Sequence, residues 1–223
     1  MAKFKLTSLQ KETLKFFSRN RFGQNFYWTG GTLLAYKYFD HRNSVDLDFF
    51  SENLYRDDEY LIFINELKKN LKAHKVIYTL KNNRRIYNIK KGREALKIEL
   101  VYFPFPRIEK SKRVKDFGIK IDSLTNIMVN KTLSSYQRKE VKDIYDLYYY
   151  FSKKHKYKLT TLLKLVEKKF GVNIEGTLLL AKIEKNLENL DSIKPMLFSK
   201  ISKSELRDFF QKEFDKLAER KIK

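Results

Sequence analysis

The sequence predicts an α+β fold in which a mixed β-sheet with flanking helices, over residues 1–120, is followed by a helical bundle over residues 121–223. Three observations predict it. Short alternating or apolar runs bounded by turn residues are confined to the first part. From Asp122 onward, helical spacing continues to the end of the chain. The 223 residues include only seven Gly and three Pro, which favours ordinary helices over a glycine-rich β-sandwich.

The composition describes a folded and strongly basic chain. Lys and Arg number 48 against 27 Asp and Glu, a formal net charge of +21, and 42% of the residues are apolar, which excludes general disorder. The absence of Cys excludes disulfides and thiolate metal sites. No apolar run is long enough to span a membrane, and the charged start is unlike a signal peptide, so we expect a cytoplasmic protein without a membrane partner. The charge favours a polyanionic partner, although Lys-rich usage in AT-rich genomes would also produce it.

Helix and strand signals alternate in the first part. Ser8 is the expected N-cap of the first helix, and a later helix begins with acids at Asp57 and ends with lysines up to Lys75, which matches the helix dipole. Residues 81–83, Lys-Asn-Asn, are typical of a hairpin turn. The basic segment 107–120 lacks periodicity and is expected to be a connection or a mobile loop. The expected helices are 8–20, 32–39 and 57–75, and the expected strands are 25–29, 44–49, 76–80, 84–90 and 95–103.

The second part carries only helical patterns. A helix that stops before Gly171 is typical of a glycine C-cap. The expected helices are 122–138, 140–154, 160–170, 175–187 and 204–220.

A glycine pair lies between an expected strand and an expected helix. Gly30 and Gly31 allow backbone N–H groups to approach an anion at the helix N-terminus, where the dipole favours phosphate, and the hydroxyl of Thr32 adds a donor. The alternative is an ordinary turn. The sequence therefore predicts a candidate phosphate site at this turn.

Three carboxylates follow on expected strands. Asp46 and Asp48 alternate with apolar residues and project from one face of a strand, an arrangement that a divalent cation would make tolerable. Glu99, on a later strand, would complete an all-oxygen Mg²⁺ (or Mn²⁺) site that orients a nucleoside triphosphate. The alternatives are a solvated strand edge for the two Asp and a surface position for Glu99.

Two segments resemble a known family. GGTLLAYKYFDHRNSVDLDFF, residues 30–50, is similar to the signature of the AbiEii/AbiGii-type nucleotidyltransferase toxins, within the DNA polymerase β-like nucleotidyltransferase superfamily. Lys131 followed by KEVKDIYDLYYYF, residues 139–151, resembles that family's Lys-bearing helix and its (K/R)DxxDL motif. The resemblance covers residues 25–151, and the tail from Ser152 carries no family signature.

The resemblance implies a nucleotidyltransferase domain over 1–120, a helical domain over 121–223, and an active site in the cleft between them. In the family pattern Gly31 and Thr32 hold the triphosphate of an NTP, and Asp46 and Asp48 bind the metals. Members with known activity transfer a nucleotide to an acceptor, in some cases the 3′ end of tRNA, and many are paired with an antitoxin. Here Thr32 replaces the usual Ser, and the third carboxylate is a Glu.

The resemblance also assigns residues of the second part. Lys131, together with Asp143 or Asp146, would approach the nucleotide or the incoming hydroxyl, and Lys142 begins the (K/R)DxxDL match. The spacing alone favours a different interpretation, because Lys142 and Asp146, four residues apart on one helix, suit an ordinary surface ion pair. Lys131 would equally suit a solvated lysine.

Basic residues of the first part suit a polyanion. The guanidinium of Arg42, just before the strand of the two Asp, could reach a phosphate or a base. An RNA-binding face could be formed by Lys81, Arg84, Arg85, Lys90, Lys91, Arg93 and the segment 107–120. A merely solvated Lys-rich surface is the alternative.

The leading hypothesis is a Mg²⁺-dependent nucleotidyltransferase that transfers NMP from an NTP to RNA, with a tRNA 3′ end as the acceptor and an antitoxin as a partner. Nucleotidylation of a protein or of a small molecule is a second hypothesis. A catalytically silent nucleic-acid-binding protein is a third, and retention of both Asp46 and Asp48 speaks against it, because without a metal their repulsion would only be a cost.

Overall fold

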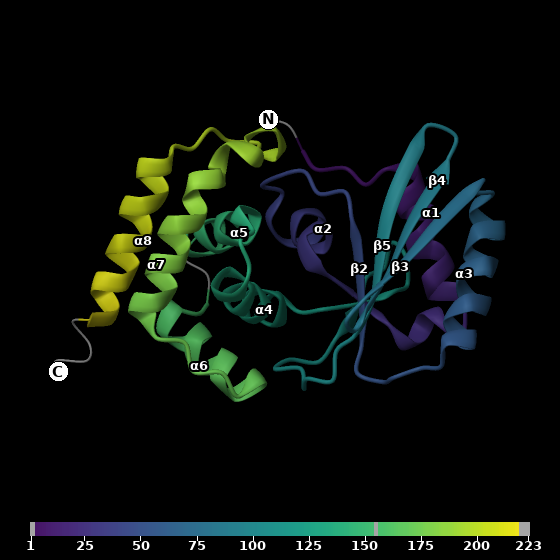
Figure 1. The fold of residues 1–223 in the computed structure, drawn as a ribbon, viewed down its shortest axis with the longest axis horizontal. Coiled ribbons are helices and arrows are strands. Elements are labelled where there is room, and N and C mark those ends of the chain that lie inside the picture. The colour runs from purple at the N-terminus through teal and green to yellow at the C-terminus, as the bar shows by residue number, and fades with distance from the viewer. Residues whose placement is uncertain (1–2, 154–155, 219–223) are drawn as a thin grey trace. The chain divides into compact units, whose positions relative to one another are not determined.

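The computed structural model describes residues 3–153 and 156–218. The described chain divides into two compact units, Lys3–Ser123 and the part from Leu124 onward (Figure 1). The fold is mixed α/β, with a mixed sheet in the first unit and helices in both.

The first unit is built on a seven-stranded sheet with the order β3-β4-β5-β2-β1-β7-β6 among the described residues. Strand β2 is parallel to β5 and β1 is parallel to β7, while the remaining neighbours are antiparallel. The central strands therefore come from distant parts of the sequence. The bounds are β1 Tyr27–Thr29, β2 Leu47–Ser51, β3 Lys75–Lys81, β4 Arg84–Lys91, β5 Glu94–Tyr102, β6 Lys112–Arg113 and β7 Lys120–Ile121.

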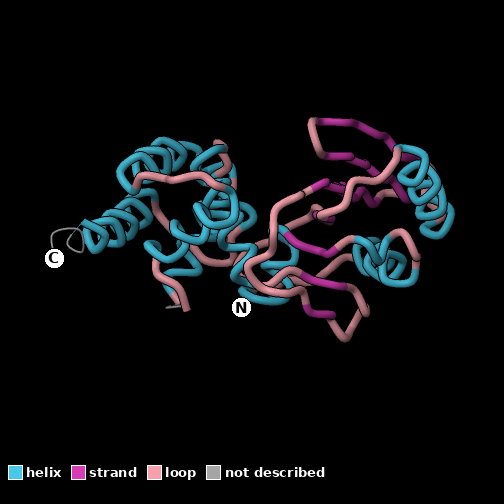
Figure 2. Tube along the Cα trace, turned by 90° about the horizontal axis from the view of Figure 1, so that it is seen from below, coloured by secondary structure: helices cyan, strands magenta, loops and turns pink. Residues whose placement is uncertain are grey.

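Helices α1 and α3 cover one face of this sheet, as Figure 2 shows. Phe17 of α1 stacks on Phe49 of β2 with ring centroids 3.7 Å apart, and it meets Phe63 of α3 edge-on at 4.9 Å. All three rings are buried, so this face of the sheet carries an aromatic core. The bounds are α1 Ser8–Arg19, η1 Gly23–Asn25, α2 Gly30–Leu33, the π-helical turn η2 Leu34–Phe39, and α3 Asp57–Leu71.

Several predicted boundaries of this unit were wrong for local reasons. Thr7, not Ser8, is the N-cap of α1, because its side chain forms a capping box with Gln10. Helix α3 ends at Leu71, since Lys72 takes a left-handed conformation with φ 53°. The segment 107–120 is more than a connection, because the short strands β6 and β7 lie in or at the end of it.

Every element described in the unit from Leu124 onward is helical. Helix α4 contacts α5, α6 and α7, and Gly171 ends α6 with φ 66°, as predicted. The predicted helix ends at Lys154 and Arg220 lie outside the described residues. No helix in the described chain is long and apolar enough to cross a membrane. The bounds are α4 Leu124–Gln137, α5 Val141–Ser152, α6 Leu159–Phe170, α7 Gly176–Asn186, η3 Leu187–Ser192, η4 Lys194–Met196 and α8 Lys203–Ala218.

Candidate active site

Strand pairing brings the predicted carboxylates to one face of the sheet. Asp48 of β2 lies opposite Thr29 of β1 and opposite Glu99 of β5. Asp46 directly precedes β2, two residues before Asp48, so strand alternation places both on the face opposite Phe49. We call this the carboxylate face.

The glycine turn packs directly against the second carboxylate. β1 ends at Thr29, and Gly30 follows with φ 79°, in the region that favours glycine. A Cβ atom at Gly30 would lie 2.8 Å from Cγ of Asp48, and one at Gly31 would lie 2.6 Å from Nη2 of Arg42. Glycine is therefore required at Gly30 by its φ and by the Asp48 carboxylate, whereas a side chain at Gly31 would displace the guanidinium of Arg42. The two halves of the predicted motif meet in space.

Thr32 and Arg42 hold the segment between the turn and the strand. Thr32 is buried, and its hydroxyl donates to the backbone carbonyl of Asp46 and lies 2.8 Å from Oγ of Ser44. Arg42 is also buried, and its Nη1 donates to the carbonyl of Asn43 at 3.0 Å. The Thr32 hydroxyl, predicted as a phosphate donor, thus fixes the backbone from which Asp46 projects.

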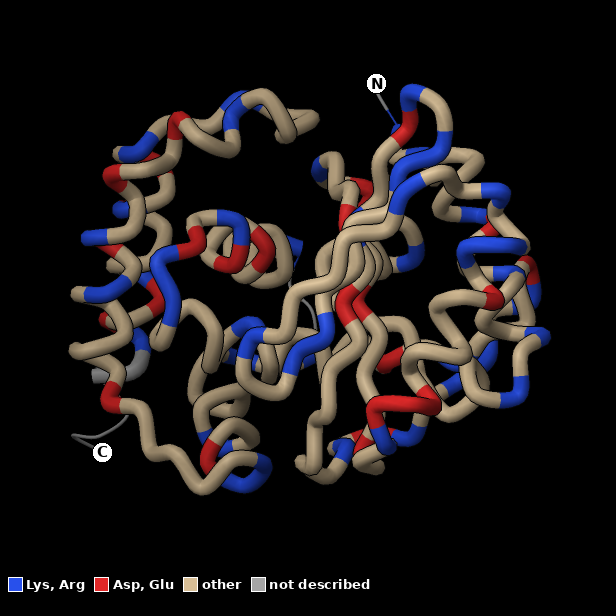
Figure 3. Tube along the Cα trace, turned by 45° about the vertical axis from the view of Figure 1, so that its right-hand side comes forward, with Lys and Arg blue, Asp and Glu red and all other residues tan. Residues whose placement is uncertain are grey.

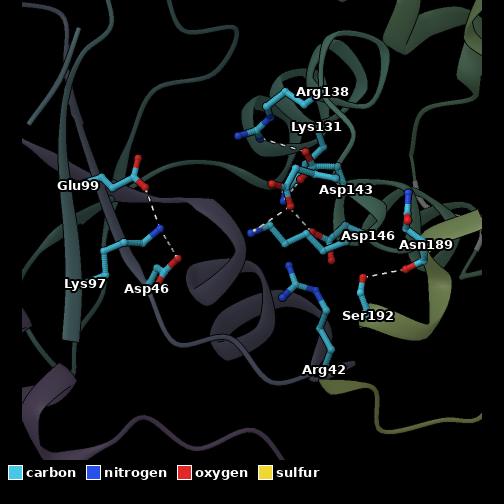
Figure 4. Close-up of polar contacts among 12 residues, drawn as sticks. Arg42, Asp46, Lys97, Glu99, Lys131, Arg138, Asp143, Asp146, Asn189 and Ser192 are labelled. Carbon is cyan, nitrogen blue, oxygen red and sulfur yellow. Dashed lines mark hydrogen bonds and ion pairs between the residues drawn. The ribbon is translucent and has the colours of Figure 1, made fainter. Parts of the chain in front are cut away.

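Lys97 of β5 lies between two of the carboxylates (Figure 4). Its Nζ is 2.7 Å from Oδ2 of Asp46 and 3.0 Å from Oε1 of Glu99, and Nη1 of Arg84 is 3.0 Å from Oε2 of Glu99. Burial opposes charge on Lys97, but the contacts with Asp46 and Glu99 outweigh it and raise its pKa. Burial alone would raise the pKa of Glu99, yet Lys97 and Arg84 hold it below its ordinary value. Glu99 is thus a buried, ionised carboxylate already paired with two cations.

This arrangement bears on the predicted metal ligands. No group of three or more His, Cys, Asp or Glu within the described ranges is placed to hold a metal ion. The predicted set of Asp46, Asp48 and Glu99 is therefore not assembled, because Lys97 separates Asp46 from Glu99. A pair of carboxylates still suits Mg²⁺, which proteins commonly bind through one or two carboxylates together with substrate phosphates.

The helical unit contains a second cluster, buried around Lys131 (Figure 4). Nζ of Lys131 on α4 lies 2.5 Å from Oδ1 of Asp143 and 2.8 Å from Oδ2 of Asp146, both on α5 and both fully buried. Nη2 of Arg138 adds a contact of 2.9 Å to Asp143. Lys131 is only 7% exposed, so the alternative of a solvated lysine is wrong.

Lys142 lies apart from that cluster. Its Nζ is 3.5 Å from Oε2 of Glu140, and both side chains are exposed. The surface ion pair between Lys142 and Asp146 that the spacing favoured is therefore not formed, because Asp146 is turned inward to Lys131.

The sheet sorts the predicted basic residues between its two faces. Pairing places Lys81, Arg84 and Lys90 on the carboxylate face, along with Lys97. Strand alternation places Arg85 and Lys91 on the other face, where Arg85 pairs with Asp57 and Lys91 with Glu12. Basic positions outnumber acidic ones along the trace, as Figure 3 shows.

Sequence reasoning missed two contributors. Lys97 and Arg138 were assigned no role, although Lys97 is two residues from Glu99 on the same strand face, and Arg138 is five residues from Asp143. Alternation along β5 was a usable signal for Lys97. No pattern pointed to Arg138, since its contact depends on the turn between α4 and α5.

A family model and a curated relative each match almost the whole chain. The family model described as "Nucleotidyl transferase AbiEii toxin, Type IV TA system" matches residues 13–221. A protein of Aquifex aeolicus (strain VF5), the uncharacterized protein aq_aa25, is 28% identical over 211 residues, covering 94% of this chain and 96% of that protein.

Two solved structures share the fold. JHP933 from Helicobacter pylori superposes with a TM-score of 0.56 at 16% identity, covering 98% of this chain and 97% of its own. A candidate nucleotidyltransferase from H. pylori gives a TM-score of 0.54 at 17% identity, covering 95% and 94%. Because the family model spans nearly the whole chain, including the glycine turn, both Asp of the carboxylate face and Lys131, this protein belongs to the AbiEii family of toxin-type nucleotidyltransferases of type IV toxin–antitoxin systems.

Proposed function

We propose that the protein transfers NMP from an NTP to an RNA acceptor, with the 3′ end of tRNA as the preferred class, in a reaction that depends on Mg²⁺ or Mn²⁺. In this proposal residues 1–120 form the nucleotidyltransferase domain and residues 121–223 form a helical domain. The family implies NTP as the substrate and an antitoxin as a partner.

One observation carries the proposal. The backbone of Gly30 lies so close to the carboxylate of Asp48 that no side chain fits between them. A phosphate held by the N–H groups of this turn would lie beside the carboxylates, which is where a cation bridging the two must be. The turn of Gly30 to Thr32 and the acidic pair, which thirteen residues separate in the sequence, thus lie side by side in space.

The roles follow from the positions of the side chains. Asp46 and Asp48 would hold the cation, which when bound neutralises the triphosphate and lowers the pKa of an attacking hydroxyl. Gly30 and Gly31 would present N–H groups to the triphosphate. Thr32 keeps Asp46 in place through the backbone carbonyl, so its hydroxyl serves the cation site indirectly.

The family resemblance supplies the remaining roles in the proposal. Lys131 would contact a phosphate, Asp146 and Asp143 would orient Lys131 or the incoming hydroxyl, and Lys142 and Arg42 would contact the nucleotide. Burial of Lys131 between two fully buried carboxylates supports a fixed orientation of its ammonium group. Burial of Arg42 beside Gly31 supports a role in shaping the turn.

An open basic surface supports RNA as the acceptor. On the carboxylate face, Lys75, Lys81 and Lys90 of β3 and β4 are exposed, and Arg84 is partly exposed. They lie on the same sheet as Asp48, so an acceptor strand bound across β3 and β4 would be directed toward the carboxylates. A polyanion would gain from each of these charges, whereas a cationic small molecule would be repelled.

The test is incubation with each α-³²P-labelled NTP, Mg²⁺ and total bacterial RNA, with Asp48→Asn as the inactive variant. Label in the tRNA band that requires Asp48 is the expected result. Label found only in protein would assign the acceptor to a polypeptide instead. Binding of RNA without any label and without any effect of Asp48→Asn would favour a silent binding protein and refute the proposal.

A matched pair of variants tests the acceptor surface. Lys81→Gln with Lys90→Gln removes two charges from the carboxylate face, whereas Lys69→Gln with Lys72→Gln removes two exposed charges at the end of α3. The first pair should raise the KM for RNA and reduce its salt dependence, and the second should not. Equal effects of both pairs would contradict RNA binding at β3 and β4.

A further inference from the structure

We propose that Lys97 is the counter-charge of the cation site. Its ammonium pairs with Asp46 until a divalent cation binds, is displaced from Asp46 by that cation, and stays paired with Glu99. The inference rests on the proposed function only in placing the cation at Asp46 and Asp48. Glu99 then holds Lys97 in place and is not a metal ligand. Lys97 is a positioning residue that sets the affinity for the cation.

Each oxygen of Glu99 already has a cationic partner. Oε1 lies 3.0 Å from Lys97 Nζ, and Oε2 lies 3.0 Å from Arg84 Nη1. The side chain of Glu99 is only 9% exposed. A divalent cation that bound Glu99 would have to share this carboxylate with two positive side chains, whose charges would repel it.

The ion pair between Lys97 and Asp46 is more exposed to water than the ion pair between Lys97 and Glu99. The contact to Oδ2 is 2.7 Å, but the side chain of Asp46 is 27% exposed and that of Lys97 is 35% exposed. Ion pairs that water reaches are weak and exchange readily. The pair with Asp46 is therefore the one that a divalent cation replaces, while the pair with Glu99 persists.

Repulsion between the acids explains why a cation is needed there at all. Asp46 and Asp48 share one strand face, and Glu99 is the cross-strand neighbour of Asp48. Lys97 and Arg84 offset this negative charge when no metal is bound. The consequence is a competition between the ammonium of Lys97 and the divalent cation for Asp46.

The competition is measured by Mn²⁺ titration of the full chain, with free Mn²⁺ followed by EPR and no NTP present. Lys97→Met should tighten Mn²⁺ binding about ten-fold, because a positive charge within a few ångströms of the ligand is removed. Lys97→Arg, which keeps the charge, should stay near the wild-type affinity. Lys90→Met, a charge removed from an exposed position of the same face, is the matched control and should change little.

Glu99→Gln separates this account from the three-ligand alternative. We expect a modest weakening of Mn²⁺ binding, since Lys97 then has only Asp46 to pair with. A loss as large as that caused by Asp48→Asn would make Glu99 a ligand and overturn the inference. Unchanged or weaker binding in Lys97→Met would overturn it as well.

Thermal unfolding gives a second readout that does not depend on activity. In EDTA, Lys97→Met should unfold at a lower temperature than wild type, and saturating Mn²⁺ should raise its Tm by more than it raises that of wild type. Equal shifts in both would contradict a counter-charge role. If Asp48→Asn binds Mn²⁺ as well as wild type does, the cation site itself is misplaced and the proposed function fails together with this inference; if only Lys97→Met behaves like wild type, the inference alone fails.

Discussion

Gly30→Ala perturbs the close approach on which the active site depends. At Gly30 the backbone has φ 79°, and a Cβ would lie 2.8 Å from Cγ of Asp48 and closer still to its Oδ2. The backbone penalty for a non-glycine residue in this region is about 1–2 kcal/mol. The carboxylate of Asp48 must also move, and a displacement of about 1 Å at a reacting group can cost about 100-fold in rate.

Comparison with Gly92→Ala separates the backbone cost at Gly30 from the cost of moving the Asp48 carboxylate. Gly92, in the turn between β4 and β5, has φ 58°, and a Cβ there would meet no atom within 4 Å. It should therefore lose about 1–2 kcal/mol of unfolding free energy and keep its activity. Gly30→Ala should lose at least as much stability and, in addition, about 100-fold or more in transfer rate.

The assay combines urea unfolding with the initial rate of label transfer from α-³²P-NTP at saturating Mg²⁺. The variants are compared at a temperature where each is fully folded. If Gly30→Ala transfers label as fast as Gly92→Ala does, the position of the Asp48 carboxylate does not matter for transfer, and its proposed role is wrong.

Three further sets of contacts can each be tested by substitution. Lys131→Met should cost about 3–5 kcal/mol in urea unfolding because it removes the ammonium that contacts the buried carboxylates of both Asp143 and Asp146, whereas Lys142→Met should cost less than about 0.5 kcal/mol; equal losses would contradict the buried cluster. Thr32→Val should cost about 1–3 kcal/mol and Thr32→Ser much less, because Ser keeps the hydroxyl that donates to the carbonyl of Asp46; similar losses would show that the methyl group matters instead. Because Lys97 and Arg84 hold the pKa of Glu99 low, its ionised form stabilises the fold above about pH 4.3, and this contribution is lost as the pH falls further; acid unfolding of Glu99→Gln should therefore be less steep than that of wild type.

Sequence reasoning was most accurate where local pattern and structure coincide. The alternation around Asp46 and Asp48 gave a strand, and the glycines before Thr32 gave the turn, because backbone requirements at these positions are local. The hairpin through residues 81–83 was confirmed for the same reason, with Asn82 at φ 53°.

Contacts between residues far apart in the chain could not be predicted from the sequence. Glu99 carried the right charge for a metal ligand, but its partners are decided by the pairing of β4 with β5, which brings Arg84 to it, and by the parallel pairing of β5 with β2. The spacing alone left Lys131 open between a solvated lysine and a phosphate contact, because no local pattern reveals that α5 turns Asp143 and Asp146 toward α4. Thr32 was expected to face a ligand, and the fold turned its hydroxyl to the backbone of Asp46.

The catalytic role of the carboxylate face is tested by comparing one of its carboxylates with one on the opposite side of the sheet. Asp48→Asn and Asp57→Asn each remove one negative charge, and Asp57 is engaged by Arg85, away from the glycine turn. The rate of label transfer from α-³²P-NTP to RNA is measured for both at saturating Mg²⁺. We expect Asp48→Asn to lose about a thousand-fold or more in kcat and Asp57→Asn to stay near wild type. An Asp48→Asn enzyme that keeps more than about a tenth of the wild-type rate would contradict that catalytic role.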